Sequence, residues 1–213
     1  GASTMKTLFK AIAVASLASA TLAQAEVSLT GGAVSDYYFR GVQLSDSSAY
    51  ASIDYAAGGF YAGVWAIDNN SELERDIYVG YATTVGDVGV DVSYTNYSYS
   101  NQGDNNETDL TLALTFAGLG LSYADVSGED AAGDDTADSS VITANYNVGN
   151  VNLLVGQVDS DADNADYNWV EVSTSADVAG LTAALTVGGQ FGVDNDNGND
   201  GYIVLDLSKS FDL

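Results

Sequence analysis

Apolar and polar residues alternate one by one along most of the chain after residue 25. In the segment 201–213, the apolar positions Ile203, Leu205, Leu207, Phe211 and Leu213 share one face. Residues 88–95 and 110–117 repeat the same period of two, whereas the period of 3.6 typical of an amphipathic helix is hard to find. The alternation therefore predicts β-strands that are buried on one face.

The pattern delimits twelve strands, most of which have about the 9–11 residues that a tilted strand needs to cross a bilayer. The predicted ranges are 26–40, 48–57, 60–67, 73–84, 88–99, 107–117, 119–126, 139–148, 151–159, 167–178, 181–191 and 201–213. Tight links that carry glycine follow the even-numbered strands, as hairpin turns require. Longer polar links follow the odd-numbered strands, at residues 41–47, 68–72, 100–106, 127–138, 160–166 and 192–200.

The alternation of short and long links indicates an architecture. In an up-and-down meander, all short links lie at one end of the strands and all long links at the other. Outer-membrane barrels have short periplasmic turns and long extracellular loops, whereas a sandwich with Greek-key crossovers has no reason to sort its links. We therefore predict an all-β fold, an antiparallel up-and-down transmembrane β-barrel of about 12 strands.

The first residues have the pattern of an exported leader. Two lysines precede an apolar run over residues 11–22, and a small-x-small cleavage site follows at residues 23–25. We expect residues 1–25 to be a cloning remnant plus a signal peptide, and residues 26–213 to form the barrel. The expected destination is the bacterial outer membrane.

The composition excludes several classes of function. The chain has a net charge of −25, with 30 acidic and 5 basic residues, and such a surface repels nucleic acid. It contains no His and no Cys, so Ser-His and Cys-His catalytic machinery cannot be built. We therefore expect no enzymatic activity, no nucleic-acid partner and no required cofactor.

A negative surface attracts cations, so loosely bound Ca²⁺ is expected on the acidic loops. The spacing of Asp194, Asp196 and Asp200 is similar to that of a calcium loop. However, Asn199 stands where an EF-hand needs Gly, and Leu205 stands where it needs Glu. We expect diffuse cation binding in preference to a specific metal site. The other expected partners are outer-membrane lipid, the barrel-assembly machinery and small solutes or cations. The sequence leaves open whether the chain forms a homo-oligomer.

Several short stretches carry a resemblance to a known family. They are residues 35–42 (SDYYFRGV), 59–65 (GFYAGVW), 76–81 (DIYVGY) and 208–211 (SKSF). These stretches resemble the TorF-type porins, small proteobacterial outer-membrane proteins, and the resemblance covers residues 27–82 and the last strand. It implies an outer-membrane barrel with a porin function, and it implies no particular substrate.

If the apolar positions of each strand face lipid, the residues between them face the lumen. On this basis the lumen-facing candidates are Asp36, Arg40, Asp54, Asp76, Asp91, Glu171 and Asp206. Tyr37 and Phe39 are expected on the lipid side of the first strand. A mostly acidic lumen with one basic residue favours cations over anions, and Arg40 is a candidate for a constriction or a structural ion pair. The prediction is an outer-membrane porin, a diffusion channel for small solutes with a cation preference.

Two alternatives stay open. The interior side chains of a small barrel can fill it, which would make a plugged barrel. The chain can also be a secreted or surface β-structural protein with acidic, cation-binding loops. Partitioning separates these cases, because a protein that folds without detergent and stays in solution cannot expose a lipid-facing apolar belt.

Overall fold

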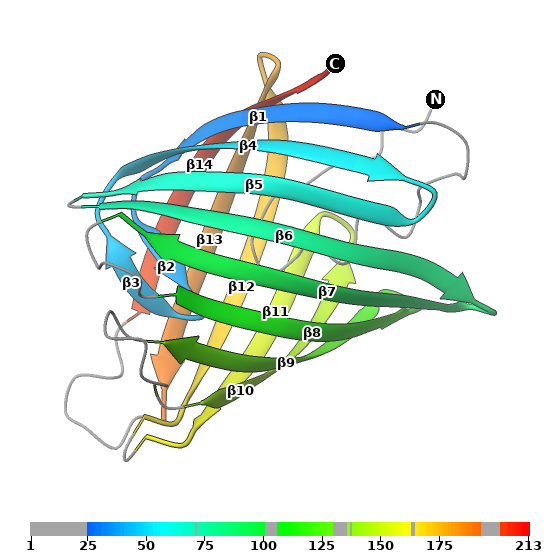
Figure 1. The fold of residues 1–213 in the computed structure, drawn as a ribbon. Coiled ribbons are helices and arrows are strands. Elements are labelled where there is room, and N and C mark those ends of the chain that lie inside the picture. The colour runs from blue at the N-terminus through cyan, green and yellow to red at the C-terminus, as the bar shows by residue number, and fades with distance from the viewer. Residues whose placement is uncertain are drawn as a thin grey trace.

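The computed structural model describes residues 25–70, 72–100, 106–129, 136, 138–162, 165–192 and 201–213. Within these residues, twelve strands close into an antiparallel barrel and two further strands form a separate hairpin (Figure 1). No helix in this part of the chain is long and apolar enough to cross a membrane. The all-β, closed-barrel architecture predicted from the alternation is confirmed.

The barrel strands follow one another around the wall in chain order. They are β1 (Glu26–Val34), β4 (Ser48–Ala57), β5 (Phe60–Asn69), β6 (Glu72–Val85), β7 (Val88–Tyr99), β8 (Asn106–Phe116), β9 (Leu119–Glu129), β10 (Ser139–Val148), β11 (Val151–Ser160), β12 (Tyr167–Val178), β13 (Leu181–Phe191) and β14 (Gly201–Asp212). β1 pairs with β4 on one side and with β14 on the other, which closes the barrel. The separate hairpin consists of β2 (Tyr37–Phe39) and β3 (Val42–Ser45).

Two-residue turns join strands at the end of the barrel that we call the short-turn end. In Ala117-Gly118 the φ angles are 50° and 85°, and in Ala179-Gly180 they are 57° and 80°. A type I′ turn needs positive φ at both central residues, and its twist matches that of the flanking strands. The other links lie at the opposite end, which we call the long-link end. The predicted long link 68–72 was wrong, because β5 runs to Asn69 and β6 begins at Glu72, which leaves only residues 70–71 between them.

An apolar belt covers the outside of the barrel. Its members include Ile77, Val79, Leu110, Leu112, Leu114, Val170, Val172, Ile203, Leu205 and Leu207, all of them exposed. Ile77, for example, is 58% exposed. An apolar surface of this extent marks contact with a membrane or a partner. The alternation of outward apolar residues with inward polar residues is typical of a transmembrane barrel.

The first strand is shorter than predicted. β1 ends at Val34, and the following residues turn back as the β2–β3 hairpin instead of extending the wall. Arg40 and Gly41 form its turn, with φ angles of 52° and 80°, which is the conformation of the two-residue turns of the barrel. The predicted strand over residues 26–40 was wrong in its last part, because the alternation of aromatic and polar residues continues through the hairpin.

Candidate functional site

The β2–β3 hairpin folds into the barrel from the first long link. Figure 1 shows it inside the barrel, near the end at which β1 leads into β4. Tyr37 packs against Trp65 of β5 with ring centroids 5.9 Å apart, and Tyr38 stacks on Tyr202 of β14 with centroids 3.9 Å apart. β5 and β14 lie on either side of β4 and β1, the two strands that the hairpin connects, so these contacts hold its base at the long-link end.

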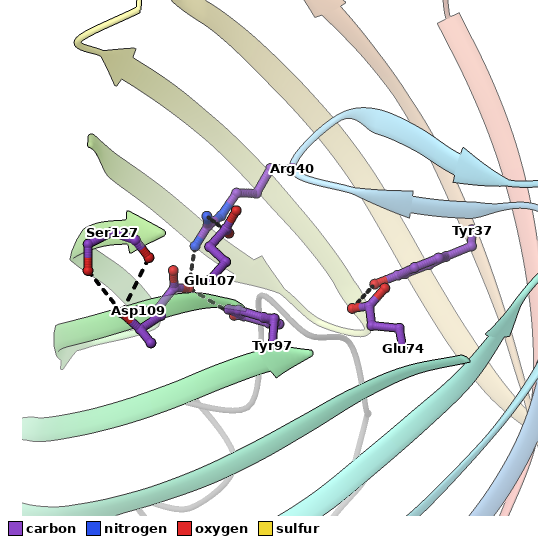
Figure 2. A network of polar contacts seen from close by, with 8 residues as sticks. Tyr37, Arg40, Glu74, Tyr97, Glu107, Asp109 and Ser127 are labelled. Carbon is purple, nitrogen blue, oxygen red and sulfur yellow. Dashed lines mark hydrogen bonds and ion pairs between the residues drawn. The ribbon is translucent and has the colours of Figure 1, made fainter. Parts of the chain in front are cut away.

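Two carboxylates of the wall hold the hairpin (Figure 2). The Tyr37 hydroxyl donates to Glu74 Oε1 at 3.0 Å, and Glu74, near the start of β6, is only 1% exposed. Arg40 Nη2 donates to Asp109 Oδ2 at 2.5 Å, and Asp109 lies near the start of β8. The hairpin is therefore fastened to two separate strands, by one hydrogen bond from a neutral hydroxyl and one from a charged guanidinium. Because β8 lies nearly opposite β1 in the ring of twelve strands, the hairpin crosses the lumen.

The guanidinium of Arg40 is largely buried among two carboxylates and an aromatic ring. Its side chain is 15% exposed and that of Asp109 is 5% exposed. Glu107 Oε1 lies 3.9 Å from Arg40 Nη1, the Tyr97 hydroxyl donates to Asp109 Oδ2 at 2.8 Å, and the Phe39 ring centroid lies 4.6 Å from the guanidinium carbon. Burial, the largest single influence, lowers the pKa of Arg40, but the charge and hydrogen bond of Asp109 together with the contributions of Tyr97 and Glu107 more than offset it. The pKa is therefore raised above its ordinary value and Arg40 stays charged.

Four inward tyrosines share one arrangement along the wall. Each ring lies across a glycine of the neighbouring strand, and each hydroxyl donates to a carboxylate on the strand beyond. In the order tyrosine, glycine under the ring and carboxylate acceptor, the four sets are Tyr50, Gly32 and Asp206; Tyr61, Gly80 and Asp91; Tyr78, Gly63 and Asp54; and Tyr202, Gly188 and Glu171. A Cβ at any of these glycines would overlap the ring, so glycine is what allows the ring to lie flat against the wall.

This arrangement supplies hydrogen bonds to carboxylates that face inward. Asp206 accepts at 2.8 Å from Tyr50, and Asp91 accepts at 3.0 Å from Tyr61. A carboxylate withdrawn from water needs such partners, since an unpaired one is costly. Because the rings lie along the wall, the carboxylates are held without bridging opposite sides of the lumen.

Most of the predicted lumen residues lie on the inner faces of barrel strands. Asp54, Asp91, Glu171 and Asp206 do so as members of the tyrosine sets, and Asp76 is buried on the inner face of β6. The structure thus brings four of the five into one repeated arrangement that the sequence did not reveal.

The prediction was wrong for the end of the first predicted strand. Asp36 and Arg40 do not lie on the wall, because the chain leaves it after Val34. Asp36 precedes β2 and accepts from Gln43 Nε2 at 3.3 Å within the hairpin region. Tyr37, expected on the lipid side, is buried inside the barrel, and Phe39 packs inside it as well, with its ring centroid 5.7 Å from that of Tyr97. Alternation assigns a side only while the chain remains part of the wall.

Sequence reasoning missed the partners of the hairpin, although a signal for them exists. Glu74 lies two positions before Asp76, and therefore on the same face of β6. Asp109 directly precedes Leu110, which is exposed on the outer belt, so the alternation assigns Asp109 to the lumen. What the sequence lacks is any indication that these carboxylates meet residues of the first link.

The inner face of β9–β12 carries an apolar cluster. The cluster consists of Ala124, Val126, Val141, Leu154, Val158 and Trp169. Trp169 is 1% exposed, lies over Gly156 of β11, and packs against Gly41 of the hairpin turn so closely that a Cβ there would overlap it. The hairpin tip is therefore seated between the charged Asp109 and the apolar Trp169.

Other predicted features lie outside the described residues. These are Asp194, Asp196 and Asp200, and nearly all of the predicted signal peptide. In the described part of the chain, no group of three or more His, Cys, Asp or Glu side chains is arranged to hold a metal ion. Loosely bound Ca²⁺ on the acidic loops stays a prediction.

Comparison with known proteins bears on the fold. A family model described as a bacterial protein of unknown function (Gcw_chp) matches residues 17–210. No curated protein matches the chain. Among solved structures, the KdgM porin aligns with a TM-score of 0.56 at 9% identity, over 87% of this chain and 99% of that one. The COG4313 outer membrane channel from Pseudomonas putida F1 aligns with a TM-score of 0.56 at 12% identity, over 93% and 98%. The closed barrel thus has the fold of outer-membrane porins and channels.

Proposed function

This chain belongs to the Gcw_chp family of bacterial proteins of unknown function, and we propose that it is an outer-membrane diffusion channel for small solutes with a preference for cations. The observation that carries the proposal is the inner face of the barrel. There, carboxylates such as Asp54, Asp76, Asp91 and Asp206 lie on the inner face of a wall whose outside is apolar. Acidic side chains arranged around a passage favour cations over anions.

The charge of Arg40 does not reverse this preference. Its guanidinium is paired with Asp109 at 2.5 Å and lies 3.9 Å from Glu107, so its positive charge is compensated locally. The inward carboxylates of Asp91, Glu171 and Asp206 accept hydrogen bonds from neutral tyrosine hydroxyls, which leave their negative charge in place. The field in the lumen is therefore negative on balance.

A fold neighbour provides a contrast in chemistry. The KdgM porin has also been solved in complex with disordered oligogalacturonate, which is a polyanion. An interior that carries carboxylates repels a polyanion, so the solutes proposed for this chain have the opposite charge to oligogalacturonate.

Two further observations support the outer membrane as the location. The resemblance to TorF-type porins covers residues 27–82 and points to the same class of protein. Two-residue turns at one end and, except between β5 and β6, longer links at the other suit short periplasmic turns and long extracellular loops. Diffusion through a barrel involves no catalytic step, so we propose a protein without enzymatic activity.

Planar-bilayer recordings of residues 26–213 under a KCl gradient test the proposal. We expect discrete conductance steps and a reversal potential that indicates cation preference. Asp91→Asn should lower that preference, whereas Asp125→Asn, the same change at an exposed position of β9, should leave it unchanged. Anion preference, or the absence of conductance in the wild type and in a hairpin-free variant, would count against a channel.

A plugged barrel is the second candidate, and the hairpin that crosses the lumen favours it. Tyr38 stacks on Tyr202 of β14, and Arg40 at the hairpin tip reaches Asp109 of β8 on the opposite side of the wall. A plugged barrel predicts a silent wild type and a conducting variant without the hairpin. The exposed apolar belt argues against a secreted β-protein that stays in solution.

A further inference from the structure

We infer that the inner face of β8 carries a binding site for organic cations of the guanidinium type, which the chain fills with its own Arg40 while the hairpin is docked. The site consists of Asp109, Glu107 and Tyr97. The inference rests on the proposed channel function only for the route by which a solute reaches the lumen.

The docked Arg40 shows what the site accepts. Its two terminal nitrogens face separate carboxylates, with Nη2 at 2.5 Å from Asp109 Oδ2 and Nη1 at 3.9 Å from Glu107 Oε1 (Figure 2). Tyr97 orients the first carboxylate by donating to Oδ2 at 2.8 Å. A planar, forked donor matches such a set better than a spherical ion does, because each arm can meet one oxygen.

Of the rings near the guanidinium, one belongs to the hairpin and one to the wall. While the hairpin is docked, the Phe39 ring lies against the guanidinium, and Phe39 and Tyr97 have ring centroids 5.7 Å apart. Phe39 would leave with the hairpin, but Tyr97 belongs to β7 and stays on the wall, where its hydroxyl holds Asp109 in place. The preference for an organic cation over Na⁺ or K⁺ therefore rests on the two carboxylates that the forked guanidinium faces.

One oxygen of the site is still able to accept a hydrogen bond. Asp109 Oδ1 has no hydrogen-bond partner among the described residues, although the Asp109 side chain is only 5% exposed. If the hairpin withdrew, Asp109 would lose its counter-charge and keep the hydrogen bond from Tyr97, a penalty for any carboxylate that is still partly withdrawn from water. A cation that replaces Arg40 removes this penalty, and a free guanidinium can also use Oδ1.

The other contacts of the hairpin do not require a cation. Tyr37 to Glu74 is a hydrogen bond from a neutral hydroxyl, and Tyr38 on Tyr202 is a stack of two neutral rings. The ion pair of Arg40 is therefore the contact for which a cationic solute competes directly. Occupation of the site by a solute and docking of the hairpin tip exclude one another.

Chemical rescue of Arg40→Ala tests the site. The refolded variant is titrated with low millimolar guanidinium chloride at constant ionic strength, and its thermal transition is followed by heat-modifiability on gels. We expect guanidinium to raise the midpoint of Arg40→Ala by roughly 2–4 °C and to leave the wild type unchanged, because its site is already filled. Urea, the neutral molecule of the same shape, and NaCl should give no rescue.

Matched variants assign the effect to this site. Arg40→Ala combined with Asp109→Asn should lose the rescue, and Arg75→Ala, which removes an exposed arginine of β6, should show none. Rescue that persists in the double variant, or an equal shift with urea, would overturn the inference, as would no shift in Arg40→Ala. If Arg40→Ala does not refold, its refolding yield with and without guanidinium becomes the measurement, with the same contrasts.

Conductance separates this inference from the proposed channel. A chain that never conducts but shows the thermal rescue has the cation site without the channel function. A chain that conducts with cation preference but shows no rescue is a channel without this site.

Discussion

The two ends of the lumen are built from the same alternation of inward and outward residues, yet their contacts run in different directions. Toward the short-turn end, Tyr61 of β5 reaches Asp91 of β7, so the contact runs along the wall between strands close together in the sheet. At the long-link end, contacts along the wall such as Tyr50 to Asp206 are also present, but the hairpin adds contacts that join Asp109 of β8 to Tyr202 of β14 and so cross the lumen.

This difference indicates which end of the lumen controls ion selectivity and which end controls the rate of passage. Carboxylates held flat along the wall contribute negative charge while taking little width from the lumen. Contacts that cross the lumen take width and carry compensated charge. We therefore expect changes toward the short-turn end to alter which ions pass, and changes at the long-link end to alter how much passes.

Removal of the hairpin is expected to have the largest effect. Val34 and Ser48 are paired across β1 and β4, so a short Gly-Ser link can replace residues 36–46 without moving the wall. Conductance in planar bilayers should rise by about an order of magnitude, because a barrel of this strand number encloses a space that the hairpin otherwise crosses. A control with Gly-Ser only at residues 46–47 keeps the hairpin and should behave as wild type. Equal conductance of the two variants would show that the hairpin does not limit passage.

Removing one charge at each end separates docking from selectivity. Asp109→Asn should lower the free energy of unfolding by about 3 kcal/mol, because it leaves the buried Arg40 without its main partner. Asp91→Asn should change it by less than about 1 kcal/mol, since the amide oxygen can still accept from Tyr61, and should lower cation preference instead. Urea unfolding in lipid vesicles and reversal potentials measure the two effects. Similar results from both variants would remove the distinction between the ends.

Neighbouring glycines of β1 test the flat tyrosine arrangement. Gly32→Ala places a Cβ against the Tyr50 ring, which should push the hydroxyl away from Asp206 and lower the free energy of unfolding by about 1–3 kcal/mol. Gly31→Ala is the matched control, because a Cβ there meets nothing within 4 Å. It should leave stability unchanged or raise it by about 0.4–1 kcal/mol. A loss of the same size at both positions would mean that contact with the ring is not the cause.

The smallest expected effect concerns the stack of Tyr38 on Tyr202. Tyr38→Leu should weaken docking by about 0.5–1.5 kcal/mol, the usual contribution of an aromatic pair, and should raise conductance slightly. Tyr38→Phe retains the ring and should match the wild type in both vesicle unfolding and bilayer recordings. A full opening of the lumen by Tyr38→Leu alone would place the main anchor at this stack and not at the ion pair.

Much of the fold and part of the site could be predicted from local pattern. The period of two places Asp91 and Asp206 inside because their apolar neighbours lie outside, and it does so at every strand that belongs to the wall. Short glycine links determine which ends of the strands meet, so the meander and its closure follow. The turn at Arg40-Gly41 could also have been found, because it has the same X-Gly form as Ala117-Gly118.

The sequence by itself therefore determined the strands, the sorting of the links and the side to which each wall residue points, since all three depend on neighbours a few positions apart. Only the tertiary structure decided that residues 37–45 leave the wall and cross the lumen. Arg40 meets Asp109 at a separation of 69 positions, and Tyr50 meets Asp206 at 156. An alternating segment satisfies the same local pattern on the wall or inside the barrel, and the choice depends on carboxylates and rings that only the closed barrel brings within reach.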